Sequence, residues 1–445
     1  MRSDGLAFYI HPPNYKSHSW EQRKVGELLI ERNEQAPMNE EYPLMAFIAN
    51  EGVAPKGERY DRSSLVTDTE NKLYKRTEFG DFIYSSNNLE TGSIGLNKYG
   101  KACISPVYSV FHPTGIADSN FLGRRLVRKD FINSMVKWRQ GVIYGQWRIH
   151  ESDFLKIDIP VPSVEEQIQI GTFLDYLDNL ITLHQRKYDK LTNVKKSMLE
   201  KMFPKNGSNV PEIRFKGFSD AWEQRKFDEV FDCTIPNNTL SRSELNYESG
   251  SVRNIHYGDI LIKYGSVVDV QNDEIPFATG KSSDDFKGAL LQDGDIIIAD
   301  TAEDETTGKA CEIGNSQGLD VVSGLHTMVC RPRNKMALGY LGYYLNSDAY
   351  HHQLLPLMQG IKVLSLSRTN VQKTMVCYPK SKAEQQLIAD CFRNLDNLIT
   401  LHQCEYIFKK YKKRCDCTST TQLILLNHQG DRSNDLFHRR VFSVR

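Results

Sequence analysis

The chain has 445 residues, more than one ordinary hydrophobic core accommodates, so its length predicts two or three domains. Its 56 Lys and Arg residues balance its 56 Asp and Glu residues, which excludes a globally basic nucleic-acid-binding protein and leaves only local basic clusters. No run of about 20 apolar residues occurs, and Met1 to Tyr15 lack the pattern of a signal peptide, so we expect a cytoplasmic protein with no membrane partner.

The chain begins with an expected N-terminal arm, residues 1–19, and then repeats itself. Trp20-Glu-Gln-Arg-Lys24 returns unchanged as Trp222-Glu-Gln-Arg-Lys226, 222 − 20 = 202 residues later. Each copy introduces a block of short β-rich runs broken by Gly, Asn and Asp. We therefore expect two tandem mixed α/β domains, over 20–162 and 222–380.

Both blocks contain a glycine and an aspartate before an apolar run. Gly80-Asp-Phe-Ile-Tyr84 and Gly294-Asp-Ile-Ile-Ile298 each predict a turn that leads into a buried strand. Gly100-Lys-Ala-Cys103 and Gly308-Lys-Ala-Cys311 also match, but at different distances from these glycines, so we interpret that match as accidental. The other expected elements are strands at Val321–Val322 and Thr327–Cys330 and helices near Asp130–Arg139 and Ala337–Leu345.

A long helix follows each block. Leu177 to Gln185 has the same nine residues as Leu395 to Gln403, at an offset of 395 − 177 = 218. Ser163 and Ser381 each open a Ser-x-x-Glu capping box, in which serine and glutamate cap each other's backbone N–H. Apolar residues recur every 3.5 positions, which favours two helices that pair with each other over an amphipathic helix packed on its own domain. The predicted pairing or subunit-interface residues are Leu174, Leu177, Ile181, His184, Tyr188, Leu191, Phe392, Leu395, Ile399, His402 and Tyr406.

The two helices are not equal in length. We expect the first over 163–203, about 58 Å long from Val164 to Met202, and the second over 381–406, because the apolar spacing is lost after Tyr406. A breaker-rich linker over 204–221 separates the halves, and 407–445 form an atypical C-terminal tail.

No catalytic residue, metal site or cofactor site stands out. Two near-matches to a phosphate-binding loop, Gly95–Ala102 and 275–282, each lack a required residue. The nine cysteines have no zinc-ligand spacing and indicate reduced thiols. His184 and His402 are better explained as polar residues that set helix register than as metal ligands. Asp300, Glu303, Asp304 and Glu305 leave a metal-dependent phosphodiester site open, although a charged turn is the simpler interpretation.

Basic and aromatic residues interleave in both blocks, in the mixture that contacts phosphates and base edges. The candidate DNA-binding residues are Arg124, Arg128, Lys137, Arg139, Gln140, Tyr144, Arg148, Arg253, His256, Tyr257, Lys263, Tyr264, Lys362 and Arg368.

The ordered double set of motifs from Trp20 to Gln403 resembles the specificity subunit of type I restriction-modification enzymes. The resemblance rests on the twin Trp-Glu-Gln-Arg-Lys motifs, the Gly-Asp strands, Ile159-Pro-Val-Pro-Ser-Val-Glu-Glu-Gln167, Tyr378-Pro379 before Glu384-Gln385, and the twin helices.

The resemblance implies an α/β fold in which two long antiparallel coiled-coil helices separate two target-recognition domains, as a tandem pseudo-two-fold repeat. It implies a non-catalytic subunit that binds a bipartite, asymmetric double-stranded DNA site. Its partners would be two modification subunits, which methylate adenine with S-adenosylmethionine, and two restriction subunits, which use ATP and Mg. The alternatives are a stand-alone Mg-dependent endonuclease and a protein-binding scaffold that does not bind DNA.

Overall fold

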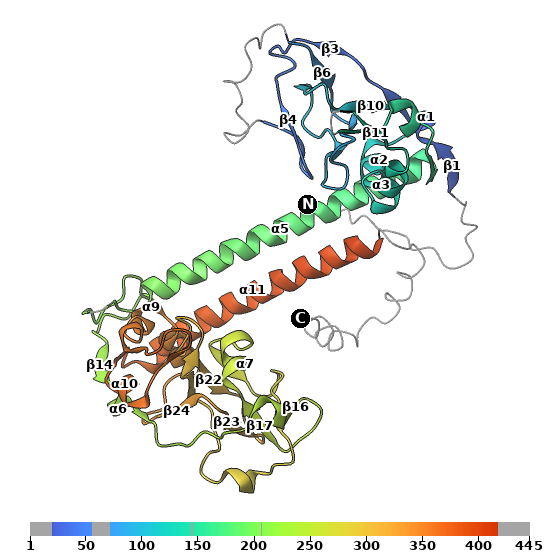
Figure 1. Cartoon of the computed structure of the whole chain (residues 1–445). Coiled ribbons are helices and arrows are strands. Elements are labelled where there is room, and N and C mark those ends of the chain that lie inside the picture. The colour runs from blue at the N-terminus through green and yellow to red at the C-terminus, as the bar shows by residue number, and fades with distance from the viewer. Residues whose placement is uncertain (1–19, 56–71, 144–145, 206, 417–445) are drawn as a thin grey trace. The chain divides into compact units, whose positions relative to one another are not determined.

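The computed structural model of the chain describes residues 20–55, 72–143, 146–205 and 207–416. The expected arm, Tyr144 and most of the expected tail lie outside these residues. The fold divides into two compact units, Met1–Ile181 with Lys409–Arg445, and Thr182–Phe408. Figure 1 shows both units and the two long helices, α5 (Val164–Lys201) and α11 (Lys382–Asp416).

The first unit is built on a four-stranded antiparallel sheet in the order β2-β10-β7-β8. Its strands are β2 (Leu29–Glu31), β10 (Ser109–Pro113), β7 (Phe82–Tyr84) and β8 (Ile94–Leu96). A separate ribbon pairs β1 (Glu21–Lys24) with β13 (Asp158–Val161). The smaller sheets are β3 (Gln35–Ala36), β6 (Tyr74–Thr77) and β9 (Ala102–Ile104); β4 (Ala46–Ile48) and β5 (Gly52–Ala54); and β11 (Gln140–Ile143) and β12 (Gln146–Arg148). The helices before α5 are α1 (Val25–Leu28), α2 (Ser119–Arg125), α3 (Lys129–Val136) and α4 (Glu151–Phe154).

The second unit has a larger sheet in the order β15-β24-β20-β22-β18. Its strands are β15 (Phe231–Asp232), β24 (Thr327–Pro332), β20 (Ile296–Ala299), β22 (Ala310–Gly314) and β18 (Val267–Asp269). A second sheet joins β16 (Leu245–Asn246), β19 (Phe277–Ala278), β17 (Val252–Ile255) and β23 (Asp320–Ser323), and ribbons pair β14 (Glu223–Lys226) with β26 (Met375–Tyr378) and β21 (Thr301–Ala302) with β25 (Leu364–Ser365). Its α-helices before α11 are α6 (Phe227–Val230), α7 (Tyr257–Ile262), α8 (Tyr340–Leu345), α9 (Asp348–His351) and α10 (Arg368–Val371), with short 3₁₀ turns at Arg242–Glu244, Ser283–Phe286 and Leu355–Leu357.

The strand after each Gly-Asp pair is an inner strand of its sheet, and its side chains enter a hydrophobic cluster on each face. This confirms the prediction of a buried strand after each turn. Side chains alternate between the faces of a strand. Phe82 and Tyr84 of β7 therefore join the core of Phe111 and Phe154, whereas Ile83 joins a different cluster on the other face. In β20, Ile296 and Ile298 lie in one cluster and Ile297 lies in another. Each inner strand is apolar throughout because both of its faces are buried.

The other expected elements also form. Strands β23 and β24 contain the predicted apolar pairs, and helices α3 and α8 lie within the predicted ranges. The Gly-Lys-Ala-Cys segments are not equivalent. The first leads into β9 of the small three-stranded sheet, whereas the second leads into β22, which pairs directly with the inner strand β20.

The long helices begin where the serines predict, and the second one ends later than expected. The Glu166 N–H donates to Ser163 Oγ at 3.3 Å, and the Glu384 N–H donates to Ser381 Oγ at 3.4 Å. Helix α11 continues to Asp416, which is 416 − 406 = 10 residues beyond the predicted end. Loss of the apolar spacing therefore does not end the helix, because the Lys and Arg residues of 407–416 are good helix formers without an apolar face.

Within the second unit, the last part of α5 lies beside α11 (Figure 1). The histidines of the two repeated nine-residue segments contact each other, with 3.1 Å between His184 Nδ1 and His402 Nδ1. Further along α5, Lys195 Nζ lies 2.5 Å from Asp396 Oδ1. The partner number falls as the residue number rises, so the contacting segments run in opposite directions.

The residues predicted to pair are buried or half-buried. Leu174 and Leu177, which belong to the first unit, are buried. Phe392, expected on the helix seam, stacks on Phe203, a residue of the range 163–203 expected for the first helix, with 5.8 Å between ring centroids, and both rings lie in the core of the second domain. Leu395 packs against the same core. The spacing of apolar residues identifies the shielded face of a helix, and it does not tell which neighbour covers that face.

The cysteines whose side chains are described are free thiols: Cys103, Cys233, Cys311, Cys330, Cys377, Cys391 and Cys404. Among the described helices, none is long and apolar enough to cross a membrane.

Candidate nucleic-acid interface

The two Trp-Glu-Gln-Arg-Lys motifs connect each domain to the start of its long helix. In the first unit, the β1–β13 ribbon places Trp20 beside the first turn of α5, where its Nε1–H donates to Glu166 Oε1 at 3.3 Å. In the second unit, the β14–β26 ribbon does the same for Trp222, which donates to Glu384 Oε1 at 3.3 Å. The glutamates of the predicted capping boxes are therefore used to hold a tryptophan from the other end of the domain.

The glutamine after each glutamate adds a second connection. Gln167 donates to the Pro162 carbonyl at 3.0 Å and accepts from the Asp118 N–H at 2.9 Å. Gln385 donates to the Pro379 carbonyl at 2.8 Å and accepts from the Ala337 N–H at 2.9 Å. We call Trp20, Glu166 and Gln167 the first clasp, and Trp222, Glu384 and Gln385 the second clasp. Both copies of Glu-Gln were visible in the sequence, but their partners were not.

The Gly-Asp pairs have a shared local chemistry as well. Both glycines have positive φ, 89° at Gly80 and 93° at Gly294, which favours glycine at these turns. The following aspartate accepts from the backbone N–H three residues earlier, at 2.8 Å for Asp81 and 2.9 Å for Asp295.

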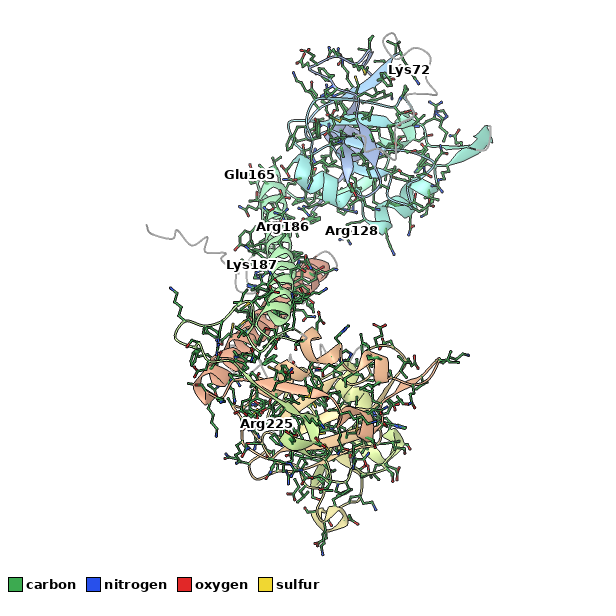
Figure 2. The ribbon with its side chains drawn as sticks, turned by 90° about the vertical axis from the view of Figure 1, so that its left-hand side faces the viewer. Lys72, Arg128, Glu165, Arg186, Lys187 and Arg225 are labelled. Atoms are coloured by element: carbon green, nitrogen blue, oxygen red, sulfur yellow. The ribbon has the colours of Figure 1, made fainter. Side chains whose placement is uncertain are left out.

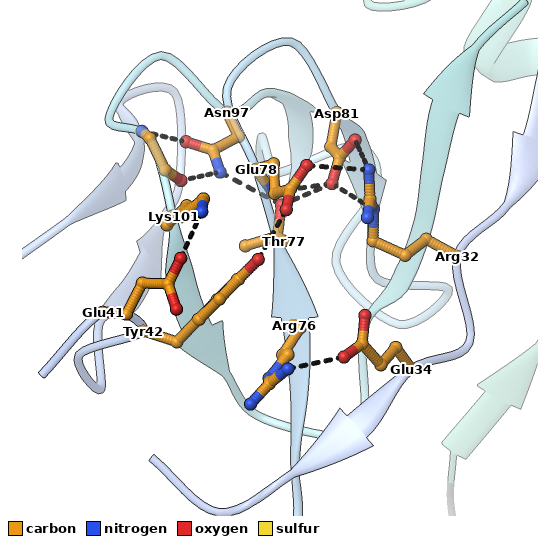
Figure 3. A network of polar contacts seen from close by, with 11 residues as sticks. Arg32, Glu34, Glu41, Tyr42, Arg76, Thr77, Glu78, Asp81, Asn97 and Lys101 are labelled. Atoms are coloured by element: carbon orange, nitrogen blue, oxygen red, sulfur yellow. Dashed lines mark hydrogen bonds and ion pairs between the residues drawn. The ribbon is translucent and has the colours of Figure 1, made fainter. Parts of the chain in front are cut away.

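Each of these buried aspartates also pairs with an arginine from another strand region. Arg32 Nε lies 2.9 Å from Asp81 Oδ2, and Arg331 binds Asp295 with two bonds of 2.7 and 2.6 Å. Burial raises the pKa of Asp81, against the opposing effect of Arg32. Figure 3 shows the network around Asp81, which extends through Glu78 to the Tyr42 hydroxyl at 2.5 Å. This network supports the turn.

Several candidate DNA-binding residues of the first unit already have partners within it. Arg124 forms ion pairs with Asp175 and Asp178 of α5, at 2.5 and 2.8 Å. Arg139 forms two bonds with Glu90, at 2.9 and 2.7 Å. These two arginines support the fold around α2 and α3, where their guanidinium groups are largely shielded.

The remaining candidates of this unit are more accessible. Arg128 lies at the N-terminal end of α3 (Figure 2) and contacts Asp130 at 3.1 Å. Lys137 is exposed after the same helix. Gln140 donates to Asp153 at 3.2 Å, and Arg148, with 64% of its side chain exposed, lies 3.9 Å from Glu151. Tyr144 lies outside the described residues.

The candidates of the second unit fall into two groups. Two members have structural contacts: the buried Tyr264 donates to the Glu274 carbonyl at 3.3 Å, and the half-buried Arg253 donates to the Val270 carbonyl. Lys263 forms an ion pair with Glu274 at 2.8 Å. Lys362 and Arg368, in contrast, are exposed.

His256 and Tyr257 lie in a small aromatic cluster. His256 Nδ1 accepts from the Gly258 N–H at 3.2 Å and caps α7, and burial lowers the pKa of its imidazole. The Tyr257 ring lies 5.3 Å from the His326 ring, edge to face. The cluster packs the half-buried Tyr257 between two histidine rings.

Both units contain a hairpin that was not singled out from the sequence. In the first, β11 pairs with β12, with Gln140 opposite Arg148. In the second, Gln359 and Ser365 exchange two backbone hydrogen bonds, of 3.0 and 2.8 Å. Gln140-Gly141-Val142 and Gln359-Gly360-Ile361 are the signal that was available, at an offset of 359 − 140 = 219.

The acidic cluster does not form a metal site among the residues that the structure describes. Asp304 accepts from Thr306, and Asp300 lies 3.6 Å from His326. A hollow of about 680 Å³ is lined by Asp304, Glu305, Thr306, Asp348, His351, His352 and Leu355. In the described part of the chain, no group of three or more His, Cys, Asp and Glu residues is arranged to hold a metal ion.

Known proteins are similar to this chain over most of its length. The family model described as "Type I restriction modification DNA specificity domain" matches twice, at residues 18–193 and 219–407. The type I restriction enzyme MjaVIII specificity subunit of Methanocaldococcus jannaschii is 23% identical over 429 residues, which cover 92% of this chain and 94% of the relative.

Solved structures with similar folds include a type I restriction-modification S subunit from M. genitalium, at 13% identity and a TM-score of 0.48, over 90% of this chain and 96% of that one. The HsdS subunit of Thermoanaerobacter tengcongensis matches at 17% identity and a TM-score of 0.42, over 91% and 96% of the two chains.

The two family matches coincide with the two clasped domains and together span most of the sequence. The chain therefore belongs to the family of type I restriction-modification DNA specificity proteins, and it is a specificity subunit that recognises a DNA target.

Proposed function

We propose that this specificity subunit reads a bipartite, asymmetric DNA site, one half with each domain. The observation that carries the proposal is that the two domains share the same supporting elements but differ in the sheets between them. Both units have the clasp, the Gly-Asp turn and the hairpin, and the strands between these features differ. The second unit contains the β16-β19-β17-β23 sheet, whereas the first contains the β3-β6-β9 sheet and the β4–β5 hairpin. Two domains that differ in these sheets would recognise two different half-sites.

We further propose that α5 and α11 pair as an antiparallel coiled coil that sets the gap between the half-sites. The opposed contacts of His184 with His402 and of Lys195 with Asp396 support this. Half-sites read by linked domains must lie at a fixed spacing along the duplex. The candidate boundaries would then be recognition domains at 20–162 and 222–380, with the second helix extended to Asp416.

The chain would contribute no catalysis and would bind no cofactor itself. It would hold two modification subunits, which use S-adenosylmethionine, and two restriction subunits, which use ATP and Mg. Since DNA is the target, the complex would act in the cytoplasm. Of the candidate residues, the exposed ones, Lys137, Arg148, Lys362 and Arg368, are the best placed to meet DNA, because their side chains already face solvent.

The test is single-molecule sequencing of DNA from cells that express this chain with its modification subunit, scored for methyladenine. We expect one split motif, methylated on both strands. Exchanging residues 227–375 for those of another recognition domain should change one half of the motif and leave the other half intact. A change in both halves contradicts the modular proposal. Cleavage of DNA by the purified chain with Mg would instead support an endonuclease.

The helix proposal has its own test. Leu177→Asp with Ile181→Asp should abolish assembly with the modification subunit on gel filtration. Tyr176→Asp is the matched control, because Tyr176 lies on the same helix with 55% of its surface exposed. Unchanged assembly of the double variant contradicts the proposed role of the helix seam.

A further inference from the structure

The hairpin of the second unit occupies the same place in the chain order as the hairpin of the first. In each unit a sheet strand is followed by two helices, the hairpin, a four-residue helix, the ribbon strand and the long helix. The first series is β10, α2, α3, β11–β12, α4, β13 and α5, and the second is β24, α8, α9, the 359–365 hairpin, α10, β26 and α11. The hairpin is therefore part of the repeated frame, although only Gln-Gly and an apolar residue recur in its sequence.

The second hairpin has a defined shape. Gln359 and Ser365 close it by two backbone hydrogen bonds, and β25 attaches it to β21, with Leu364 opposite Ala302. Gly360 has a φ of 122°, and a Cβ atom there would collide with the Val363 carbonyl oxygen. Only glycine fits at this position, so the tip is a turn of defined conformation.

The tip presents apolar side chains to solvent. Ile361 is 100% exposed and Val363 is 51% exposed, and the exposed Lys362 lies between them. Burial of an aliphatic side chain stabilises a fold or a complex. The domain does not bury Ile361, so this side chain is available to a partner outside the domain.

We propose that the Gln359–Ser365 hairpin enters the major groove and reads bases of the half-site that the second domain recognises. This inference rests on the proposed function. A two-stranded ribbon fits the major groove, which is about 12 Å wide. There, Ile361 and Val363 can contact thymine methyl groups, and Lys362 can donate to guanine O6 and N7.

The charges around the hairpin limit the contact to its tip. Strand β21, which holds the hairpin, is followed by the exposed carboxylates of Glu303, Asp304 and Glu305. Carboxylates repel phosphates, so this loop faces away from the DNA backbone while the tip reaches the bases. The hairpin of the first unit carries different residues, Gln140 and the exposed Arg148 among them, and it reads the other half-site.

The test uses the full chain with its modification subunit. We compare wild type with the triple variant Ile361→Ser, Lys362→Ala, Val363→Ser. Binding to a duplex that carries the motif identified by sequencing should weaken about 10- to 100-fold. The half of the motif that the second domain recognises should become degenerate, while the other half is kept. The matched control is Ile262→Ser, an apolar residue of the same unit that is 90% exposed on α7, and it should keep both affinity and motif.

The thermal unfolding temperature of the triple variant should stay unchanged, because the three side chains are exposed. If wild type yields a split motif and the triple variant keeps the same motif and affinity, the hairpin inference is wrong and the proposed function stands. If wild type yields no split motif, the proposed function itself fails. Loss of assembly with the modification subunit in the triple variant would make the hairpin a protein contact and would overturn the inference.

Discussion

The two clasps use the same residues in different surroundings. Trp222 is 3% exposed, and its acceptor Glu384 also binds Arg214 through two bonds of 2.7 and 2.9 Å. Trp20 is 38% exposed, and its hydrogen bond to Glu166 lies at the surface. Hydrogen bonds and ion pairs contribute little where water competes and much where their loss leaves a buried charge. One sequence motif therefore stabilises the two domains to different extents.

The largest difference should appear when the glutamate of each clasp is removed. Glu384→Ala leaves the guanidinium of Arg214, with 12% of its side chain exposed, without its partner. We expect the second unit to lose about 3–5 kcal/mol of unfolding free energy. Glu166→Ala should cost the first unit about 0.5–1 kcal/mol.

Hydrogen–deuterium exchange of the full chain, followed by mass spectrometry, measures the two units separately. Equal losses in both units would show that burial does not separate the clasps. Glu384→Gln is the control, because it keeps an acceptor for Trp222 and removes only the charge.

The Gly-Asp turns should behave alike where the clasps differ. Asp81→Asn and Asp295→Asn keep an acceptor for the turn N–H but remove the charge that faces Arg32 or Arg331. Hydrogen bonds to charged groups contribute more than neutral ones, so each variant should lose about 2 kcal/mol. Urea unfolding measured unit by unit checks this, and a loss confined to one unit would mean that the turns are not equivalent.

In the second unit, Glu312 should make stability depend on pH. This carboxyl group is 1% exposed on β22 and accepts from the Gly342 N–H at 2.9 Å, and burial raises its pKa from 4.5 to about 7. Between these values the folded state keeps a proton that the unfolded state releases. The contribution of Glu312 is therefore fully present below about pH 4.5 and is lost as pH rises through about 7.

Over this range, the stability of the second unit should fall by roughly 1–3 kcal/mol. Glu312→Gln keeps an acceptor for Gly342 and should reduce the slope. The same slope in wild type and in the variant would assign the pH dependence to another group.

Much of the frame was predictable because it is encoded locally. The serine caps, the turn glycines and the apolar strand after each Gly-Asp pair depend on residues within a few positions of one another. The end of α11 was misplaced since a helix can continue without an apolar stripe.

The candidate interface was predicted less well than the frame. Arg124 and Arg139 were predicted to contact DNA, but the structure pairs them with carboxylates 51 and 49 residues away in sequence. The hairpins were overlooked because Gln-Gly is too short a signal to stand out, and only their equal place in the two folds identifies them as a repeated element.

Residue spacing along the chain predicted the tandem repeat, the Gly-Asp strands, the starts of the long helices and the family. Those features follow from contacts between near neighbours. The structure was needed to show that Trp20 contacts Glu166 across 146 residues, that Glu384 is shared by Trp222 and Arg214, and that Ile361 is exposed to solvent. The physical reason is that a side chain's partners and its burial are set by segments far away in the chain, and spacing along one segment carries no record of them.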